Sequence, residues 1–406
     1  MLPDEDAVID GGRPSLPSPS DRRRGLVFLW LVAGCVSFAL AMQIGLNANF
    51  LANDMKLEGA QLGYLEAARE SCGILALAIL AVLAGITEPL VAAGMLLLLA
   101  IGMSSYYAVP TFAWLVPMSV VWSLGFHVWV PLPNSIAHGL AEPGRFGHRL
   151  GQVQAAGAVG FATALLTALV ATRLGVHMRP LYLVAGASAV LGAILCLGIP
   201  RQIKTPGPRL VFRRRYGLYY VLSFLEGWRK QIAVAFAAFM LVKIHGTPLT
   251  VILMLQGASQ ALIYVASPRV GRLIDRIGER SVLVFYYVTL FFIFVGYAII
   301  PNPHVLYILF VFDNALFVLA MSLTTYVSRL APRSELTPTL SMGVAMNHAA
   351  AVTMPLVSGL LWTYASYHWA FLLGAVAAVL SVVVSLYVPA HAQQEQPVCV
   401  EPADPP

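Results

Sequence analysis

The segment Ser223-Phe-Leu-Glu-Gly-Trp-Arg-Lys-Gln-Ile232 puts three charged side chains in the middle of an apolar run, residues 218–242. The run is long enough to cross a bilayer. Glu226, Arg229 and Lys230 have the spacing i, i+3, i+4, so a helix presents them within an arc of about 100°. Ionised groups at mid-membrane are costly unless they face protein or water. We therefore expect this face to line the interior of a transport pathway.

The composition is that of a polytopic membrane protein. Of 406 residues, 59% are hydrophobic and 11% are charged, whereas about a quarter of the residues of a soluble domain are charged. The cysteines Cys35, Cys72, Cys196 and Cys399 are scattered, so we expect neither a disulfide framework nor a metal site. The common enzyme and phosphate-loop motifs do not occur. We therefore expect no enzyme activity, no cofactor and no ATP-driven transport.

Twelve apolar runs predict an all-α integral membrane protein with 12 transmembrane helices. The runs cover residues 25–48, 61–84, 89–109, 112–136, 151–172, 180–199, 217–243, 249–267, 281–300, 304–327, 340–363 and 369–389. With both termini cytoplasmic, the inner segments carry 18 Lys and Arg and the outer loops carry 4. Because Lys and Arg gather in cytoplasmic loops, this distribution sets the orientation. It also accounts for the net charge of +6 without a nucleic-acid partner.

A basic linker, residues 200–216, divides the twelve runs six and six. It predicts an N-terminal bundle over residues 25–199 and a C-terminal bundle over residues 217–389. The two ends of the chain, residues 1–24 and 390–406, are polar and rich in proline. We expect them to be disordered and cytoplasmic.

The two halves also resemble each other faintly in sequence. Gln43-Ile-Gly-Leu-Asn-Ala-Asn-Phe50 can be laid on Gln231-Ile-Ala-Val-Ala-Phe-Ala-Ala238. With a two-residue gap, residues 64–71 then fall on residues 254–261. Duplicated six-helix halves are typical of transporters that hold substrate near mid-membrane between them. The chain is therefore predicted to form two pseudo-symmetric bundles.

One loop motif points to a known family. The stretch Gly271-Arg-Leu-Ile-Asp-Arg-Ile-Gly-Glu-Arg280 resembles the major facilitator superfamily signature Gly-x-x-x-Asp-Arg-x-Gly-Arg-Arg/Lys, with Glu279 replacing a cation. With twelve runs and a basic central linker, the resemblance covers essentially the whole chain. It implies alternating access and a conformational latch in this loop, and its two glycines permit tight turns. The implied latch residues are Gly271, Asp275, Arg276, Gly278 and Arg280.

Two departures from the superfamily pattern limit what the resemblance implies. The equivalent turn of the first half, Gly85-Ile-Thr-Glu-Pro89, has neither the Asp-Arg pair nor a cation, which puts a latch there in doubt. The run 151–172 lacks the Gly-Pro-x-x-Gly-Gly element that the family links with drug-proton exchangers. A multidrug antiporter is therefore less favoured.

A second charged helix face lies in the run 61–84. Glu66, Arg69 and Glu70 again have the spacing i, i+3, i+4. They form either a proton-sensitive gate near the outer mouth or an intrahelical pair that neutralises itself. In the superfamily the seventh helix lines the cavity, so Arg229 or Lys230 is placed to meet substrate or a coupling carboxylate.

Further polar residues lie deep in the apolar runs. Asp313 is either a proton carrier, because burial favours a neutral carboxyl group, or the partner of Arg229 or Lys230. His127 titrates in a useful range, although a lone histidine on an apolar helix more often hydrogen-bonds a neighbour. His348 is a second proton-coupling candidate. The remaining candidate substrate contacts are Trp129, Asn314 and Gln256.

These observations predict a monomeric secondary transporter in a bacterial inner membrane. The cations at mid-membrane favour a small organic anion as substrate, coupled to a proton or ion gradient. Export of drug-like or amphipathic compounds is the alternative, favoured by the apolar, aromatic-rich runs. A transporter-like sensor or assembly protein that carries nothing is the second alternative.

Overall fold

A computed structural model of the chain describes residues 18–142, 144–203 and 212–390. The predicted tail 391–406 and most of the predicted N-terminal segment lie outside these residues. The first helix begins at Pro19 rather than at residue 25, because the hydroxyl of Ser18 accepts a hydrogen bond from the backbone N–H of Asp21. This is an N-cap of the ordinary kind. The predicted disorder is therefore wrong for residues 19–24.

The described residues form helices and no strand, which confirms the all-α fold. The first half contains α1 Pro19–Asn49, η1 Phe50–Asp54, α2 Gly59–Val82, α3 Glu88–Ser105, α4 Phe112–Trp129, α5 Leu132–Leu140, α6 Phe146–Arg173 and α7 Met178–Cys196. The second half contains η2 Arg214–Tyr216, α8 Gly217–Gln231, η3 Ile232–Ala237, α9 Ala238–Lys243, α10 Leu249–Ile299, α11 Pro303–Leu316, η4 Phe317–Ala320, α12 Met321–Leu330, α13 Arg333–Tyr364 and α14 Tyr367–Ser385.

Several long helices are interrupted inside the fold. A π-helical turn occurs in the first helix of each half, as η1 after α1 and as η3 after α8. Helix α10 is broken at Gly278, where φ is 79° and only glycine adopts the conformation readily. Gly271 lies within the helical part of α10, so the predicted turn there is wrong. The loop motif bends at one glycine rather than two.

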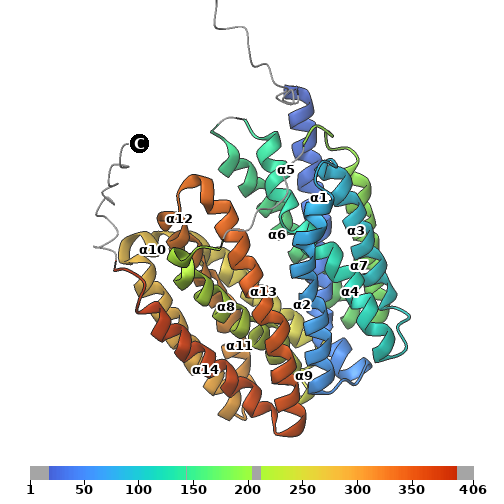
Figure 1. Cartoon of the computed structure of the whole chain (residues 1–406). Coiled ribbons are helices and arrows are strands. Elements are labelled where there is room, and N and C mark those ends of the chain that lie inside the picture. Colours follow the sequence, from blue (N-terminus) through green and yellow to red (C-terminus); the bar gives the residue numbers. More distant parts are fainter. Residues whose placement is uncertain (1–17, 143, 204–211, 391–406) are drawn as a thin grey trace, which may run out of the picture.

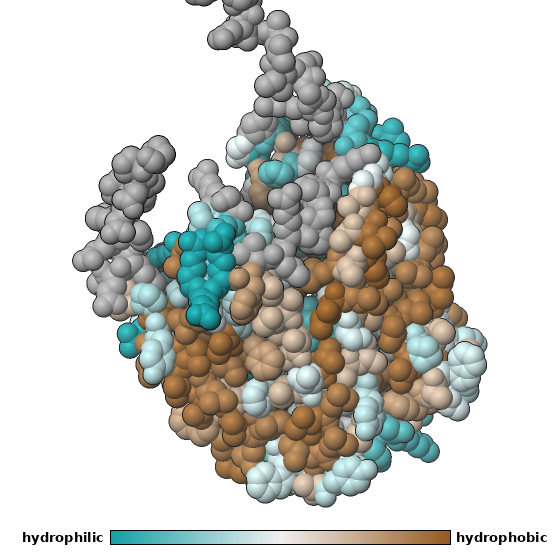
Figure 2. Space-filling view, viewed as in Figure 1, coloured by the Kyte–Doolittle hydropathy of each residue, from teal (hydrophilic) through white to brown (hydrophobic). Residues whose placement is uncertain are grey.

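Nine helices among the described residues are long and apolar enough to cross a membrane. They do not include α2 and α8, each of which carries three charged side chains. Helix α10 counts once although it is broken at Gly278. Figure 2 shows the matching surface, with apolar residues over the middle of the molecule and polar residues toward its ends. The chain is a multi-pass membrane protein, while the number of twelve crossings stays a prediction.

Helices α2 and α13 form the seam between the two halves (Figure 1). Their backbones touch, since a Cβ added at Gly63 would lie 2.3 Å from the carbonyl oxygen of Pro355. A Cβ added at Gly359 would lie 2.4 Å from the carbonyl oxygen of Gly59. Small residues allow such close approach between membrane helices. The glycines of these two helices therefore bring α2 and α13 into direct contact.

Hydrogen bonds that join the halves gather at the end of the seam near residues 49–60. The backbone N–H of Ala60 donates to Thr363 Oγ1 at 2.8 Å, and Asn49 donates to the carbonyl oxygen of Thr247 at 3.2 Å. Lys243 Nζ lies 2.8 Å from Glu58 Oε1. Toward the opposite end the ribbons of α5 and α12 diverge (Figure 1). We call the joined end the closed end.

Candidate functional site

The charged face of α8 is held by hydroxyl groups and a guanidinium group. Arg229 Nε donates to Glu226 Oε1 at 3.1 Å along the same helix. The hydroxyl groups of Tyr286 and Tyr287 donate to the two oxygens of Glu226 at 3.0 and 3.3 Å. All four side chains are buried. The i, i+3 spacing of Glu226 and Arg229 therefore gives an ion pair within α8, and this pair is embedded in the second half.

Asp313 of α11 completes this cluster. Its Oδ1 lies 3.8 Å from Arg229 Nη1, and its Oδ2 accepts from the hydroxyl of Tyr297 at 3.3 Å. The structure thus places Asp313 beside Arg229 rather than beside Lys230. Glu226, Arg229 and Asp313 form a buried trio with two carboxylates and one guanidinium. We call these three residues the buried trio.

Lys230 is the third charged side chain of α8 and is not part of the trio. It is half-buried, and within the described residues it makes no hydrogen bond or ion pair. Its charge acts on Glu70 and, more weakly, on Glu66 of α2. Two carboxylates of α2 are therefore within range of the surplus charge that α8 carries, although neither forms an ion pair with Lys230 among the described residues. The sequence argument counted α8 alone, and whether an outside anion meets the surplus charge stays a prediction.

The charged face of α2 contains the second predicted pair. Arg69 Nη1 lies 2.6 Å from Glu66 Oε1, and its guanidinium carbon is 4.4 Å from the centre of the Trp122 ring. The two charges neutralise each other, as one of the two sequence interpretations expected. Whether the pair also acts as a gate stays a prediction.

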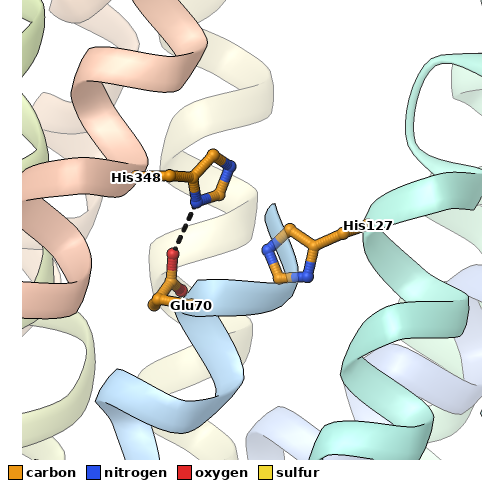
Figure 3. Close-up of side chains that lie close together, drawn as sticks. All are labelled: Glu70, His127 and His348. Carbon is orange, nitrogen blue, oxygen red and sulfur yellow. Dashed lines mark hydrogen bonds and ion pairs between the residues drawn. The ribbon is translucent and has the colours of Figure 1, made fainter. Parts of the chain in front are cut away.

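Glu70 is not part of this pair and lies beside two histidines, as Figure 3 shows. His348 Nδ1 of α13 lies 2.9 Å from Glu70 Oε2. The ring of His127 from α4 packs edge-on against His348, with centroids 5.0 Å apart. Gly73 makes room, since a Cβ there would lie 2.3 Å from the His348 ring. Three residues that are far apart in sequence therefore form one cluster on the seam, which we call the His–Glu cluster.

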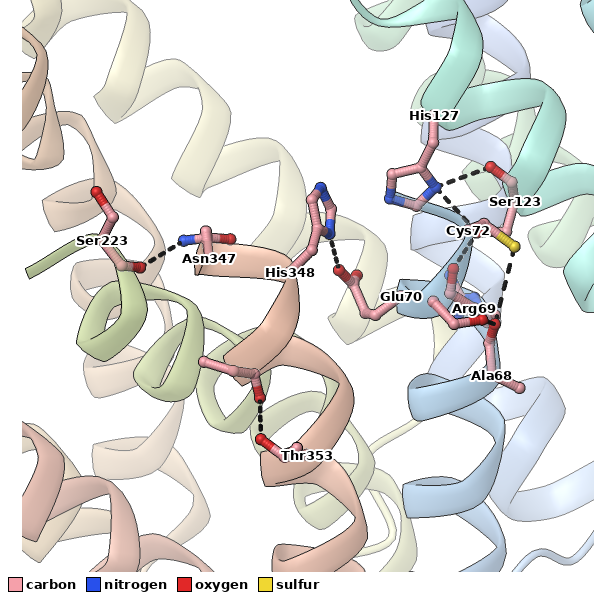
Figure 4. Close-up of polar contacts among 12 residues, drawn as sticks. Ala68, Arg69, Glu70, Cys72, Ser123, His127, Ser223, Asn347, His348 and Thr353 are labelled. Carbon is pink, nitrogen blue, oxygen red and sulfur yellow. Dashed lines mark hydrogen bonds and ion pairs between the residues drawn. The ribbon is translucent and has the colours of Figure 1, made fainter. Parts of the chain in front are cut away.

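A cavity of about 260 Å³ opens beside this cluster. It lies between α8, α12 and α13, and Asn347 at its wall donates to the carbonyl oxygen of Ser223 at 3.3 Å (Figure 4). Its lining residues are Tyr219, Ser223, Glu226, Ala320, Leu323, Thr324, Gly343, Val344, Asn347 and His348. Glu226 and His348 are the only predicted site residues among them.

The other predicted substrate contacts do not line this cavity. Trp129 is buried in an apolar cluster of the first half, Asn314 donates to the carbonyl oxygen of Phe310 in its own helix, and Gln256 is buried in α10. Sequence reasoning missed Tyr219 as a lining residue. It precedes Glu226 by seven positions, two helical turns along the same face, and that spacing is the signal that could have found it.

The predicted latch contains a partner that the motif does not name. Arg329 of α12 lies 3.3 Å from Asp275 Oδ1 and, through Nε, 3.0 Å from Glu279 Oε1. Glu279, which departs from the family pattern, is fully buried, while Asp275 and Arg276 are exposed. No ion pair involves Arg276 or Arg280 within the described residues. Glu279 is therefore the most buried charged residue of the motif, and Arg329 is its one ion-pair partner among the described residues.

The first half has a related contact in spite of its short turn. Glu88, at the start of α3, is buried and accepts a hydrogen bond from Ser135 Oγ of α5 at 2.6 Å. Both halves therefore anchor a buried glutamate on the element that follows the loop. In the second half the partner is an arginine, and in the first half it is a serine.

The fold matches solved transporters along nearly its whole length. A variant of the nucleoside transporter NupG superposes with a TM-score of 0.76 at 15% identity, over 89% of this chain and 98% of that one. A bacterial homologue of the human lysosomal transporter Spinster, inward-facing and occupied, gives 0.74 at 13% identity over 95% and 100%. The peptide transporter POT in complex with sulfate gives 0.69 at 13% identity over 90% and 93%.

The sequence carries a family match in its second half. Residues 216–398 match the Major Facilitator Superfamily. Those residues belong to the superfamily, and the whole chain has its fold. No curated protein sequence matches the chain. The matched family and the solved structures with this fold are those of transporters rather than enzymes.

In the fold that these structures share, the seam between the two halves is where binding sites are found. In this fold, substrate and ion sites lie near mid-membrane where the two halves meet. The His–Glu cluster lies on that seam, within range of the charge of Lys230, and the cavity adjoins it. The buried trio lies behind it, within the second half.

Proposed function

We propose that the chain moves a small organic anion across the membrane by alternating access and couples this movement to protons. One observation carries the proposal: Lys230, half-buried in α8, makes no hydrogen bond or ion pair among the described residues. Glu70, which is within range of its charge, is already bonded to His348. The Lys230 ammonium group has three N–H donors, and all three are available to an anionic group that reaches it.

The buried trio supplies a reason for proton coupling. With all three side chains ionised it carries one net negative charge, and burial makes such a charge costly. Asp313 is the less firmly held carboxylate, because its Oδ1 accepts no hydrogen bond. A proton on Asp313 leaves the neutral pair Glu226–Arg229. We infer that Asp313 takes up the coupling proton.

The cavity lining favours the alternative substrate class. Eight of its ten lining residues are uncharged at every ordinary pH, and Lys230 is not among the ten. A neutral or amphipathic compound suits such a wall better than a small anion does. The two classes separate in a thermal-shift screen of purified protein, because a ligand that binds the folded state stabilises it. Stabilisation by neutral compounds alone favours the alternative.

Substitution of Lys230 tests the lead proposal. We expect Lys230→Gln to weaken binding of the anionic ligands found in the screen by about tenfold, which is about 1.4 kcal/mol. Flux of the same ligands into proteoliposomes should fall in parallel. Lys56→Gln serves as the matched control, because Lys56 is exposed at the closed end. Equal affinity in Lys230→Gln and the native chain contradicts the proposal.

Flux itself separates transport from the sensor alternative. A chain that binds ligands in the screen but moves none of them across proteoliposomes under any imposed gradient acts as a sensor or assembly protein. We expect an imposed proton gradient, in one of its two directions, to raise the accumulation of substrate inside the proteoliposomes above the level reached without a gradient.

A further inference from the structure

The His–Glu cluster brings metal-binding atoms together from both halves of the molecule. Glu70 comes from α2, His127 from α4 and His348 from α13, and one ligand atom of each lies within 4.8 Å of the other two. The side chains of Glu70 and His348 are 12% exposed. Figure 3 shows the three side chains turned toward one another. The cluster is thus a largely buried set of two imidazoles and one carboxylate.

We propose that Glu70, His127 and His348 bind a divalent transition metal ion of the zinc class, with water as a fourth ligand. Two histidines and one glutamate with an open position are a recurrent donor set for Zn²⁺. Imidazole nitrogen suits zinc and its neighbours in the first transition row, whereas Mg²⁺ and Ca²⁺ prefer sites built from oxygen. The inference goes beyond the proposed function, because it rests on the ligand geometry alone.

The hydrogen bonds around the cluster orient His127 for such a role. His127 Nδ1 lies 2.8 Å from the carbonyl oxygen of Ser123, which only accepts, so Nδ1 must donate. The lone pair of the neutral ring is then on Nε2. The hydroxyl of Ser123 donates to the carbonyl oxygen of Arg69 at 2.8 Å and lies 3.1 Å from His127 Nδ1, so it can accept from the same N–H (Figure 4). Metal-binding histidines are commonly fixed by a backbone carbonyl in this way.

The cluster must rearrange to accept an ion, because its three ligand atoms lie within 4.8 Å of one another rather than at the spacing of bound ligands. Ligand atoms around a tetrahedral Zn²⁺ are about 3.4 Å apart, given bonds of about 2.1 Å. Glu70 Oε2 and His348 Nδ1 are 2.9 Å apart, so this pair must open by about 0.5 Å as the ion replaces their shared hydrogen. His348 then carries its proton on Nε2. The His348 ring packs directly against Gly73, so it must shift away from that residue.

Nearby charges weaken the site without abolishing it. Glu70 is within range of the charge of Lys230 from α8, which opposes a second cation. Arg69 is neutralised by Glu66 at 2.6 Å. Removal of the Lys230 charge should therefore strengthen metal binding, which is the opposite of its expected effect on an anionic substrate. The same substitution thus separates this inference from the proposed function.

A metal ion at this site would tie the two halves together. Glu70 and His127 belong to the first half and His348 to the second, on the seam that leads to the closed end. A conformation that opens this end must pull His348 away from the other two ligands. Zn²⁺ is therefore expected to hold the structure closed at this end and to slow transport.

The test measures Zn²⁺ binding to the full chain in detergent by titration calorimetry. We expect one ion per chain, with affinity lowered about tenfold or more in His127→Gln and in His348→Gln. His304→Gln, a histidine outside the cluster, is the control and should bind like the native chain. Lys230→Met keeps all three ligands and should bind about fivefold more tightly.

A second measurement keeps the test decisive if a histidine variant fails to fold. Co²⁺ replaces Zn²⁺ in tetrahedral nitrogen and oxygen sites and then absorbs strongly in the visible range. The native chain and Lys230→Met should both show this band. A native chain that binds neither ion at micromolar concentration overturns the inference. The inference is also overturned if one Zn²⁺ ion still binds with native affinity to both histidine variants in folded form. A Lys230→Met variant that binds Zn²⁺ less tightly than the native chain overturns it as well.

Discussion

At the residue scale, ion pairs within one helix could be predicted from the spacing of charges in the sequence. Contacts between different helices could not be predicted. The pairs Glu66–Arg69 and Glu226–Arg229 follow from the i, i+3 rule, and both are present. The contact between Glu70 and His348 joins positions 278 residues apart. No local pattern encodes such a contact, because it depends on how α2 and α13 pack.

The buried trio yields a prediction about stability. Arg229→Gln leaves Glu226 and Asp313 without a cation in a fully buried site, and removal of one partner from such a cluster costs about 3–5 kcal/mol. Asp313→Asn instead leaves the neutral pair Glu226–Arg229. We expect thermal unfolding to show a large loss for Arg229→Gln and no loss for Asp313→Asn.

Transport assays extend this prediction to coupling. If Asp313 takes up the proton, Asp313→Asn should abolish accumulation driven by a proton gradient. Exchange of labelled for unlabelled substrate should continue, because it needs no net proton movement. Loss of both activities in a stably folded Asp313→Asn protein would show that the carboxylate only positions Arg229.

At the scale of the element, the apolar runs predicted the helices well and their interruptions poorly. The runs 61–84 and 89–109 correspond to α2 and α3 with small differences at their ends. The π-helical turns were not foreseen, and neither was the break between α4 and α5, although it falls at Pro131 and Pro133, which are local helix-breaking signals. Gly278 was identified as a turn because glycine alone favours a positive φ.

The seam between α2 and α13 can be tested with one methyl group. Gly63→Ala puts a Cβ 2.3 Å from the backbone oxygen of Pro355, which cannot move aside as a flexible side chain can. We expect the helices to separate and the closed end to open more readily, with a lower unfolding temperature. Gly94→Ala in α3 is the control, because a Cβ there meets nothing within 4 Å. Equal unfolding temperatures for both variants would contradict this account of the seam.

The latch gives a second prediction at this scale. Glu279 is fully buried against Arg329, whereas Asp275 is exposed, so the buried contact should matter more. Glu279→Gln is expected to change the balance between the two conformations and the transport rate. Asp275→Asn should have a smaller effect on the conformational balance and on the transport rate. A larger effect of Asp275→Asn would place the latch in the exposed contact that the family motif names.

At the scale of the whole molecule, the fold was predictable because hydropathy alone nearly determines where membrane helices begin and end. Which face of each helix meets which neighbour was not predictable from one sequence. The structure shows that the two halves are joined at the end near Ala60 and Thr363. Under the predicted orientation that end is the outer one, and we infer an inward-facing conformation.

A reversible cross-link tests whether this end opens during transport. The backbone nitrogen of Ala60 is 2.8 Å from Thr363 Oγ1, which makes Ala60→Cys with Thr363→Cys a suitable pair once the native cysteines are replaced. Alternating access requires the two halves to part here in each cycle, because the substrate must reach both sides of the membrane. Oxidation should therefore stop flux in proteoliposomes, and a reductant should restore it. Each single cysteine variant is the control, since it cannot form the bond within one chain. Full flux through the oxidised double variant would mean that this end stays joined throughout the cycle, and the halves would then have to move about some other contact.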